Sequence, residues 1–137
     1  MGFVEKINEN HRILKKCLAL SAYNVGASRA YYCVFTQIKK YLIAKNFNYE
    51  AFLEEINKPW ERKFSHGTIK EAVVKVLLQD KEMDLNISNI NVIDNLYYKR
   101  RKADYTERNI SKKEFEDSIN EMRKIEEILK NAETRAV

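Results

Sequence analysis

The chain has 137 residues, of which 45% are hydrophobic and 33% are charged, and its formal net charge is +5. This length allows one domain with a buried core and is too short for two. No apolar segment approaches the ~18 residues of a membrane-spanning helix, so we expect no contact with the membrane interior. The N-terminal segment has no apolar signal core, and we therefore expect a cytoplasmic protein.

The scarcity of glycine and proline indicates the fold class. The sequence contains only 3 glycines and 1 proline, the residues that most often interrupt helices and form turns. We therefore expect an all-α fold, a single up-and-down bundle over residues 1–137 with about five helices. The tail after about residue 131 is polar, and we expect it to fray.

Apolar residues at helical spacing predict a first helix over residues 3–20. Its inner face is expected to carry Val4, Ile7, Leu14 and Leu18. His11 falls on the same stripe, where a lone histidine is more often a packed residue than a metal ligand.

A second predicted helix covers residues 23–45 and has two different stripes. The first stripe is apolar and consists of Tyr31, Val34, Phe35, Ile38, Tyr41 and Leu42. Gly26, Ala27 and Ala30 are small and permit close approach of another helix. The second stripe mixes aromatic and hydrogen-bonding groups: Val25, Arg29, Tyr32, Cys33, Thr36 and Lys40. We expect this second stripe to face a later helix, a second subunit or a ligand phosphate.

The middle of the chain predicts a short helix near Phe52, ended by Pro59, and then a longer helix. Trp60 and Phe64 are expected to hold this connection against the core. Thr68 and Glu71 have the spacing of a capping box, with Ser65 as the alternative cap.

The next predicted helix spans residues 88–104 and has Ile90, Ile93 and Tyr97 on its inner face. The same spacing places Arg100 and Asp104 on that face. They can pair along the helix, and buried charges need such partners. An ion pair between Arg29 and Asp104 is the alternative. A last helix is expected to open with a capping box at Ser111 and Glu114.

The sequence contains two cysteines, Cys17 and Cys33. They are not in CxxC spacing, and no histidine lies near either of them in the sequence. We therefore expect two buried thiols, no metal site and no cofactor.

Three segments together form a recognisable pattern: YNVGASRAYYCVF at 23–35, FSHGTIKEA at 64–72 and LYYKRRKADY at 96–105. With the helix lengths, they resemble the HEPN superfamily (higher eukaryotes and prokaryotes nucleotide-binding). The resemblance implies a helical bundle that forms homodimers. It also implies a toxin or phage-defence role, often with a minimal nucleotidyltransferase antitoxin as partner. Active HEPN members are metal-independent ribonucleases that use an arginine followed a few residues later by a histidine.

This sequence has Arg100 at the position of that arginine, but no histidine follows it. His66 is then the candidate histidine for acid or base chemistry, and Asp104 is the alternative base. The candidate catalytic residues are Arg100, Asp104 and His66. The candidate RNA-binding or nucleotide-binding residues are Arg29, Tyr32, Lys99, Arg101 and Lys102, with a solvated helix face as the alternative for the basic run.

Tyr105 is a candidate modification site. In some HEPN toxins, the partner nucleotidyltransferase transfers AMP to a tyrosine just after the motif, and Tyr105 follows Arg100 closely. The alternative is that Tyr105 packs against Phe115. Three functions stay open: a HEPN protein that cleaves or binds RNA, a non-catalytic HEPN partner of a nucleotidyltransferase or nucleotide, and a generic helical interaction protein.

Overall fold

A computed structural model describes residues 2–79 and 90–135. Within these ranges it contains six α-helices and no strand, which confirms the all-α prediction. The helices are α1 (Gly2–Ala19), α2 (Tyr23–Ala44), α3 (Tyr49–Glu55), α4 (Ile69–Leu78), α5 (Val92–Tyr105) and α6 (Lys112–Arg135). The short helix near Phe52 brings the number above the expected five, and the predicted helix start at residue 88 lies outside the described residues. In these ranges, no helix combines the length and apolarity that a membrane span requires.

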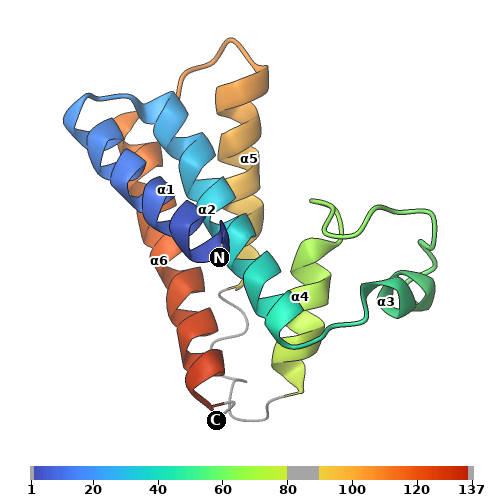
Figure 1. Cartoon of the computed structure of the whole chain (residues 1–137). Helices are drawn as coiled ribbons and strands as arrows, with labels where there is room; N and C mark the ends of the chain where they lie inside the picture. Colours follow the sequence, from blue (N-terminus) through green and yellow to red (C-terminus); the bar gives the residue numbers. More distant parts are fainter. Residues whose placement is uncertain (1, 80–89, 136–137) are drawn as a thin grey trace.

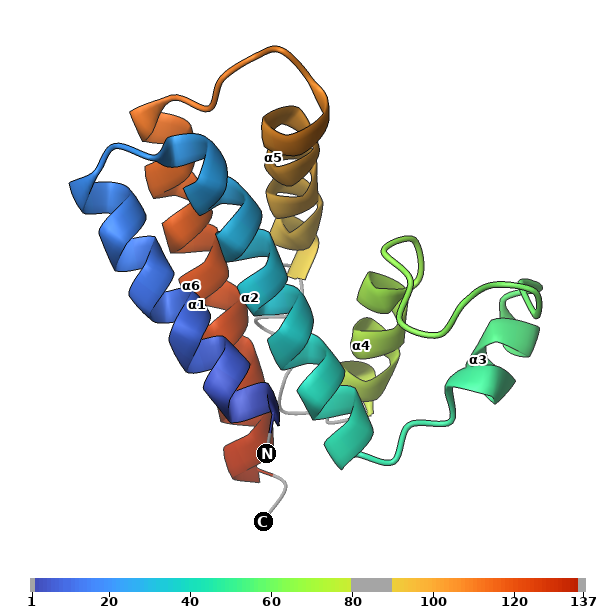
Figure 2. The same cartoon turned by 45° about the horizontal axis from the view of Figure 1, so that its top comes forward.

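The four helices α1, α2, α5 and α6 lie alongside one another as a bundle, with α4 packed on α2 and α3 further to the side (Figures 1 and 2). The central helix is α2, which contacts α1, α4, α5 and α6. A central helix must be apolar on more than one side. This explains why Cys33, on the second stripe of α2, is as fully buried as its neighbours on the first.

The apolar stripe predicted for α2 is confirmed. Its members Tyr31, Val34, Ile38, Tyr41 and Leu42 are all buried, and only Phe35 is partly exposed. The small residues Gly26, Ala27 and Ala30 are buried as well, so they form a surface on which other helices approach α2 closely. At Gly26 the approaching group is the ring of Phe115, from α6.

Gly26→Ala is expected to destabilise the fold by roughly 1–3 kcal/mol, the usual cost of overpacking a filled core. The added methyl group would overlap the Phe115 ring, which has 0% exposure and little room to move. The measurement is the free energy of unfolding in urea. Gly67→Ala is the matched control, because a methyl group there meets nothing within 4 Å. Equal stability of the two variants would contradict the tight contact.

The two predicted capping boxes have different outcomes. At α6 the prediction is confirmed: Glu114 N donates to Ser111 Oγ at 3.1 Å, and Ser111 N donates to Glu114 Oε1 at 3.1 Å. At α4 it is wrong, because the Thr68 side chain makes no cap hydrogen bond. Thr68 Oγ1 instead bonds Tyr49 Oη at 2.7 Å and Ser65 Oγ at 2.8 Å. Tyr49 of α3 and Ser65 of the preceding loop therefore take the place of the cap hydrogen bond.

Three apolar residues that the sequence places in the core are exposed. Val4 and Leu18 on α1 are each 52% exposed, and Trp60 is 78% exposed. Because α1 lies at the edge of the bundle, it buries only a narrow stripe, which includes Leu14 and Cys17. At the other end of the chain, α6 continues to Arg135, beyond the residue where fraying was expected. Ala132 is buried there, so α6 is packed against the core at that residue.

Candidate functional site

The Arg100 side chain lies between α2 and α5, as the helical spacing of α5 predicts. It is buried, with 7% exposure. Its Nη2 donates hydrogen bonds to Tyr32 Oη and, at 3.0 Å, to Tyr105 Oη. The guanidinium carbon also lies 5.1 Å from the centre of the Tyr32 ring and 4.9 Å from that of Tyr105. Two phenols, one on each helix, therefore hold this cation by hydrogen bonds and cation–π contact.

Asp104 supplies the negative charge beside Arg100. Arg100 Nε lies 3.2 Å from Asp104 Oδ2, and Ser28 Oγ donates to the same oxygen at 3.0 Å. These are the partners of Asp104 among the described residues, so the alternative pair between Arg29 and Asp104 is wrong. Ser28 is buried on the side of α2 that contacts α5. Arg29, the next residue, lies over the Tyr32 ring at 5.8 Å instead.

These side chains form one unit, which we call the Arg100 cluster: Ser28, Tyr32, Arg100, Asp104 and Tyr105. Burial lowers the pKa of Arg100, but Tyr32, Tyr105 and Asp104 together raise it above its ordinary value. Arg100 is therefore cationic at any physiological pH. Its buried Nε has no hydrogen-bond partner with acceptable geometry in residues 2–79 and 90–135, so its contact with Asp104 is an ion pair without a hydrogen bond.

His66 lies beside this cluster, in the loop before α4. Its Nδ1 is hydrogen-bonded to Tyr31 Oη, and its ring is stacked on Tyr97 with centroids 5.4 Å apart. Burial lowers the pKa of His66, and the nearby Arg100, Arg62 and Arg101 lower it further. The imidazole is therefore neutral near pH 7.

The hydrogen bond with Tyr31 limits what His66 can do chemically. Burial strongly raises the pKa of Tyr31, so this phenol keeps its proton and can donate it to His66 Nδ1. When Tyr31 is the donor, the imidazole proton lies on Nε2, and in this arrangement His66 is a hydrogen-bond donor rather than a base. Asp104 is no better placed, because its Oδ2 already pairs with Arg100 and accepts a hydrogen bond from Ser28.

The four consecutive basic residues of α5 point in different directions. Lys99 is 6% exposed and forms an ion pair with Glu121 of α6. Lys102 Nζ lies 3.0 Å from Glu114 Oε2, also on α6. Of the run, only Arg101 is exposed, and its guanidinium carbon lies 5.2 Å from the centre of the Tyr105 ring. The structure thus separates Lys99 and Lys102 from the Arg100 cluster and leaves Arg101 beside it.

Tyr105 is 61% exposed and lies against Arg100 and Arg101. The alternative that it packs against Phe115 is wrong, since the ring partner of Phe115 in the described structure is Tyr23. Sequence reasoning did not assign Ser28, Tyr31 or Arg62 to the functional site. Ser28 and Tyr31 lie in the SRAYY segment that carries the resemblance, whereas Arg62 has no sequence signal.

Comparisons of the chain with family models, with curated proteins and with solved structures find no match. The chemistry of the Arg100 cluster and of the groups beside it is therefore the basis on which a function can be inferred.

Proposed function

We propose that this chain is a HEPN-like protein of a prokaryotic toxin–antitoxin or phage-defence module, and that it binds RNA at the Arg100 cluster. The observation that carries the proposal is the environment of Arg100. Its Nη2 donates to two phenol oxygens, and the Asp104 side chain that pairs with it is 33% exposed. A phosphate oxygen is a stronger, charge-assisted acceptor than a phenol.

Tyr105 is the side chain that opens this site. It covers Arg100 from the solvent side and is itself 61% exposed. When it turns outward, a phosphate takes the place of its hydroxyl on Arg100 Nη2. Arg101 and Arg62, both exposed, then contact neighbouring phosphates. The exposed rings of Tyr98 and Tyr105 offer stacking surfaces for single-stranded bases.

Binding without efficient cleavage is the form of this function that the site favours. RNA cleavage without a metal needs a base near neutral pH. In this chain the Nδ1 atom of His66 is hydrogen-bonded to Tyr31, and Asp104 is paired with Arg100.

The resemblance adds a twofold homodimer and a nucleotidyltransferase partner to the proposal. The second candidate function, a non-catalytic partner of that enzyme, is favoured by the same lack of a base.

Arg101→Ala is expected to weaken binding of single-stranded RNA several-fold. It is also expected to reduce the slope of log affinity against log salt by about 1, because one phosphate contact is lost. Fluorescence anisotropy with a labelled oligonucleotide over a range of salt concentrations measures both effects. Arg12→Ala is the matched control, since Arg12 is exposed on α1, on the other side of α2 from α5.

The same preparation, incubated with total RNA, tests cleavage. The wild-type chain is expected to leave the RNA intact. Cleavage that survives both Arg100→Lys and His66→Ala would show that the reaction takes place elsewhere. Equal loss of affinity in the Arg101→Ala and Arg12→Ala variants would contradict a binding surface at the Arg100 cluster.

Tyr105 is expected to gain one AMP group when the chain is co-expressed with an adjacent nucleotidyltransferase. Tyr105 is 61% exposed, and the added phosphate would lie beside Arg100 and Arg101, where it blocks RNA phosphates. Intact-mass measurement should show the gain in wild type and in Tyr98→Phe, a control tyrosine that is 56% exposed. A gain that persists in Tyr105→Phe would place the modification elsewhere.

A further inference from the structure

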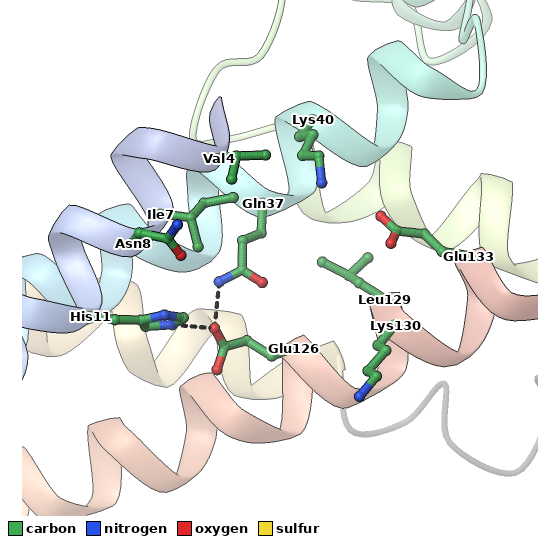
Figure 3. A pocket seen from close by; sticks show the side chains of 10 residues that line it. All are labelled: Val4, Ile7, Asn8, His11, Gln37, Lys40, Glu126, Leu129, Lys130 and Glu133. Atoms are coloured by element: carbon green, nitrogen blue, oxygen red, sulfur yellow. Dashed lines mark hydrogen bonds and ion pairs between the residues drawn. The ribbon is translucent and has the colours of Figure 1, made fainter. Parts of the chain in front are cut away.

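A pocket of about 200 Å³ opens between α1, α2 and α6, on a part of the bundle that the proposed function does not use (Figure 3). His11, Gln37 and Glu126 meet in its wall, each from a different helix. His11 and Glu126 also line a neighbouring pocket along α1 and α6. Cys33 lies directly beneath this wall and is fully buried.

The polar atoms of these residues converge on one point. His11 Nε2 lies 2.6 Å from Glu126 Oε2. Gln37 Nε2 donates to the same carboxylate oxygen and lies 3.3 Å from Cys33 Sγ. One ligand atom each from His11, Cys33 and Glu126 lies within 4.8 Å of the other two. Ligand atoms around a tetrahedral zinc ion are separated by roughly 3.3–3.8 Å, given metal–ligand bonds of about 2.0–2.3 Å. On metal binding, His11 Nε2 and Glu126 Oε2 would have to move apart from 2.6 Å to this separation, with the three ligand atoms rearranged around the ion.

We propose that His11 Nε2, Cys33 Sγ and a Glu126 oxygen bind a divalent transition-metal ion, with zinc as the best fit. An imidazole, a thiolate and a carboxylate form a donor set that zinc accepts. Calcium and magnesium prefer oxygen ligands alone and do not suit a thiolate. On binding, Cys33 releases its proton to solvent, and the charge of the ion is balanced by the thiolate and the carboxylate.

His11 and Glu126 line the pocket, so a fourth ligand such as water can reach the ion from it. Three protein ligands with one open position, filled by water, is an arrangement that zinc adopts in many proteins. Gln37 lies next to these ligands. Without a metal ion, its amide nitrogen donates hydrogen bonds to both Glu126 and Cys33. A metal ion would replace these hydrogen bonds and join α1, α2 and α6 through a single centre, so it should stabilise the folded chain.

Cobalt(II) is the probe for this site, because a cobalt–thiolate bond gives a charge-transfer absorption band and tetrahedral cobalt gives intense visible bands. The full chain, reduced and freed of metal, is titrated with cobalt chloride and then with zinc chloride. We expect one equivalent of cobalt to produce these bands and zinc to remove them. Zinc is also expected to raise the thermal unfolding temperature.

Matched variants test the ligands one by one. Cys33→Ala should abolish the thiolate band, whereas Cys17→Ala should retain it, because Cys17 is also buried but lies outside the cluster. Since Cys33 has no exposure and its substitution can disturb folding, His11→Gln provides an independent test at a side chain that is 38% exposed. His11→Gln is expected to weaken zinc affinity by roughly tenfold or more and to remove the thermal stabilisation.

Two outcomes would overturn the proposal. One is a wild-type chain that gives no thiolate band with excess cobalt, which would make the cluster a hydrogen-bonded network only. The other is a zinc affinity that stays unchanged in a folded Cys33→Ala or His11→Gln variant. Neither result depends on RNA binding, so this site and the Arg100 cluster can fail separately.

Discussion

Arg100→Ala is expected to lower the free energy of unfolding by roughly 2–4 kcal/mol. This loss lies between the cost of removing an exposed ion pair and the cost of breaking a buried one. The reason is that Arg100 is buried whereas the Asp104 side chain is 33% exposed. The variant also removes the cation that joins Tyr32 of α2 to Tyr105 of α5. Urea unfolding followed by circular dichroism measures this loss.

Arg101→Ala is the matched control for Arg100→Ala. Arg101 is the next residue in the chain, is exposed, and should change stability by at most about 0.5 kcal/mol. A third variant, Arg100→Lys, separates folding from function: it keeps the charge but loses the planar group that donates to both phenols. It is expected to stay folded and to lose most RNA affinity. Equal unfolding midpoints for Arg100→Ala and Arg101→Ala would show that the Arg100 cluster contributes no stability.

Lys99→Ala is expected to be at least as destabilising, with a cost of roughly 3–5 kcal/mol. Lys99 and Glu121 form an ion pair whose side chains are only 7% and 14% exposed. Removing the lysine leaves a carboxylate in the α5–α6 interface without its cation. The double variant Lys99→Met with Glu121→Leu should regain most of the loss, because two apolar side chains of similar size need no partner charge.

The pair between Lys113 and Asp117 on α6 is the control for this prediction. These side chains are 84% and 47% exposed, so Lys113→Ala should cost no more than about 0.5 kcal/mol. Chemical denaturation of these three variants and of the wild-type chain gives the comparison. A similar loss for Lys99→Ala and Lys113→Ala, or a double variant that is less stable than Lys99→Ala, would contradict the account of a buried pair.

Several features of this protein follow from its sequence because they depend on neighbours within one helix. The periodicity of α2 indicates which side chains are buried, and the spacing on α5 brings Arg100 and Asp104 to one face. The cap formed by Ser111 and Glu114 needs only residues three positions apart. In each case the interacting groups are placed by helical geometry alone, before any other helix is considered.

Other features depend on how the helices pack, and the sequence pattern does not predict them. Lys99 and Lys102 belong to a basic run that suggests a phosphate-binding surface, yet carboxylates of α6 occupy both. The hydroxyl of Thr68 bonds Tyr49 and Ser65 rather than the start of its own helix. No motif spacing links His11, Cys33 and Glu126, and their side chains meet because they lie on three helices that pack together.

Sequence alone determined which faces of the helices are apolar, since that follows from a fixed helical period. Only the tertiary structure decided which charged groups meet, because the partner of a side chain depends on the rotation and relative shift of a second helix.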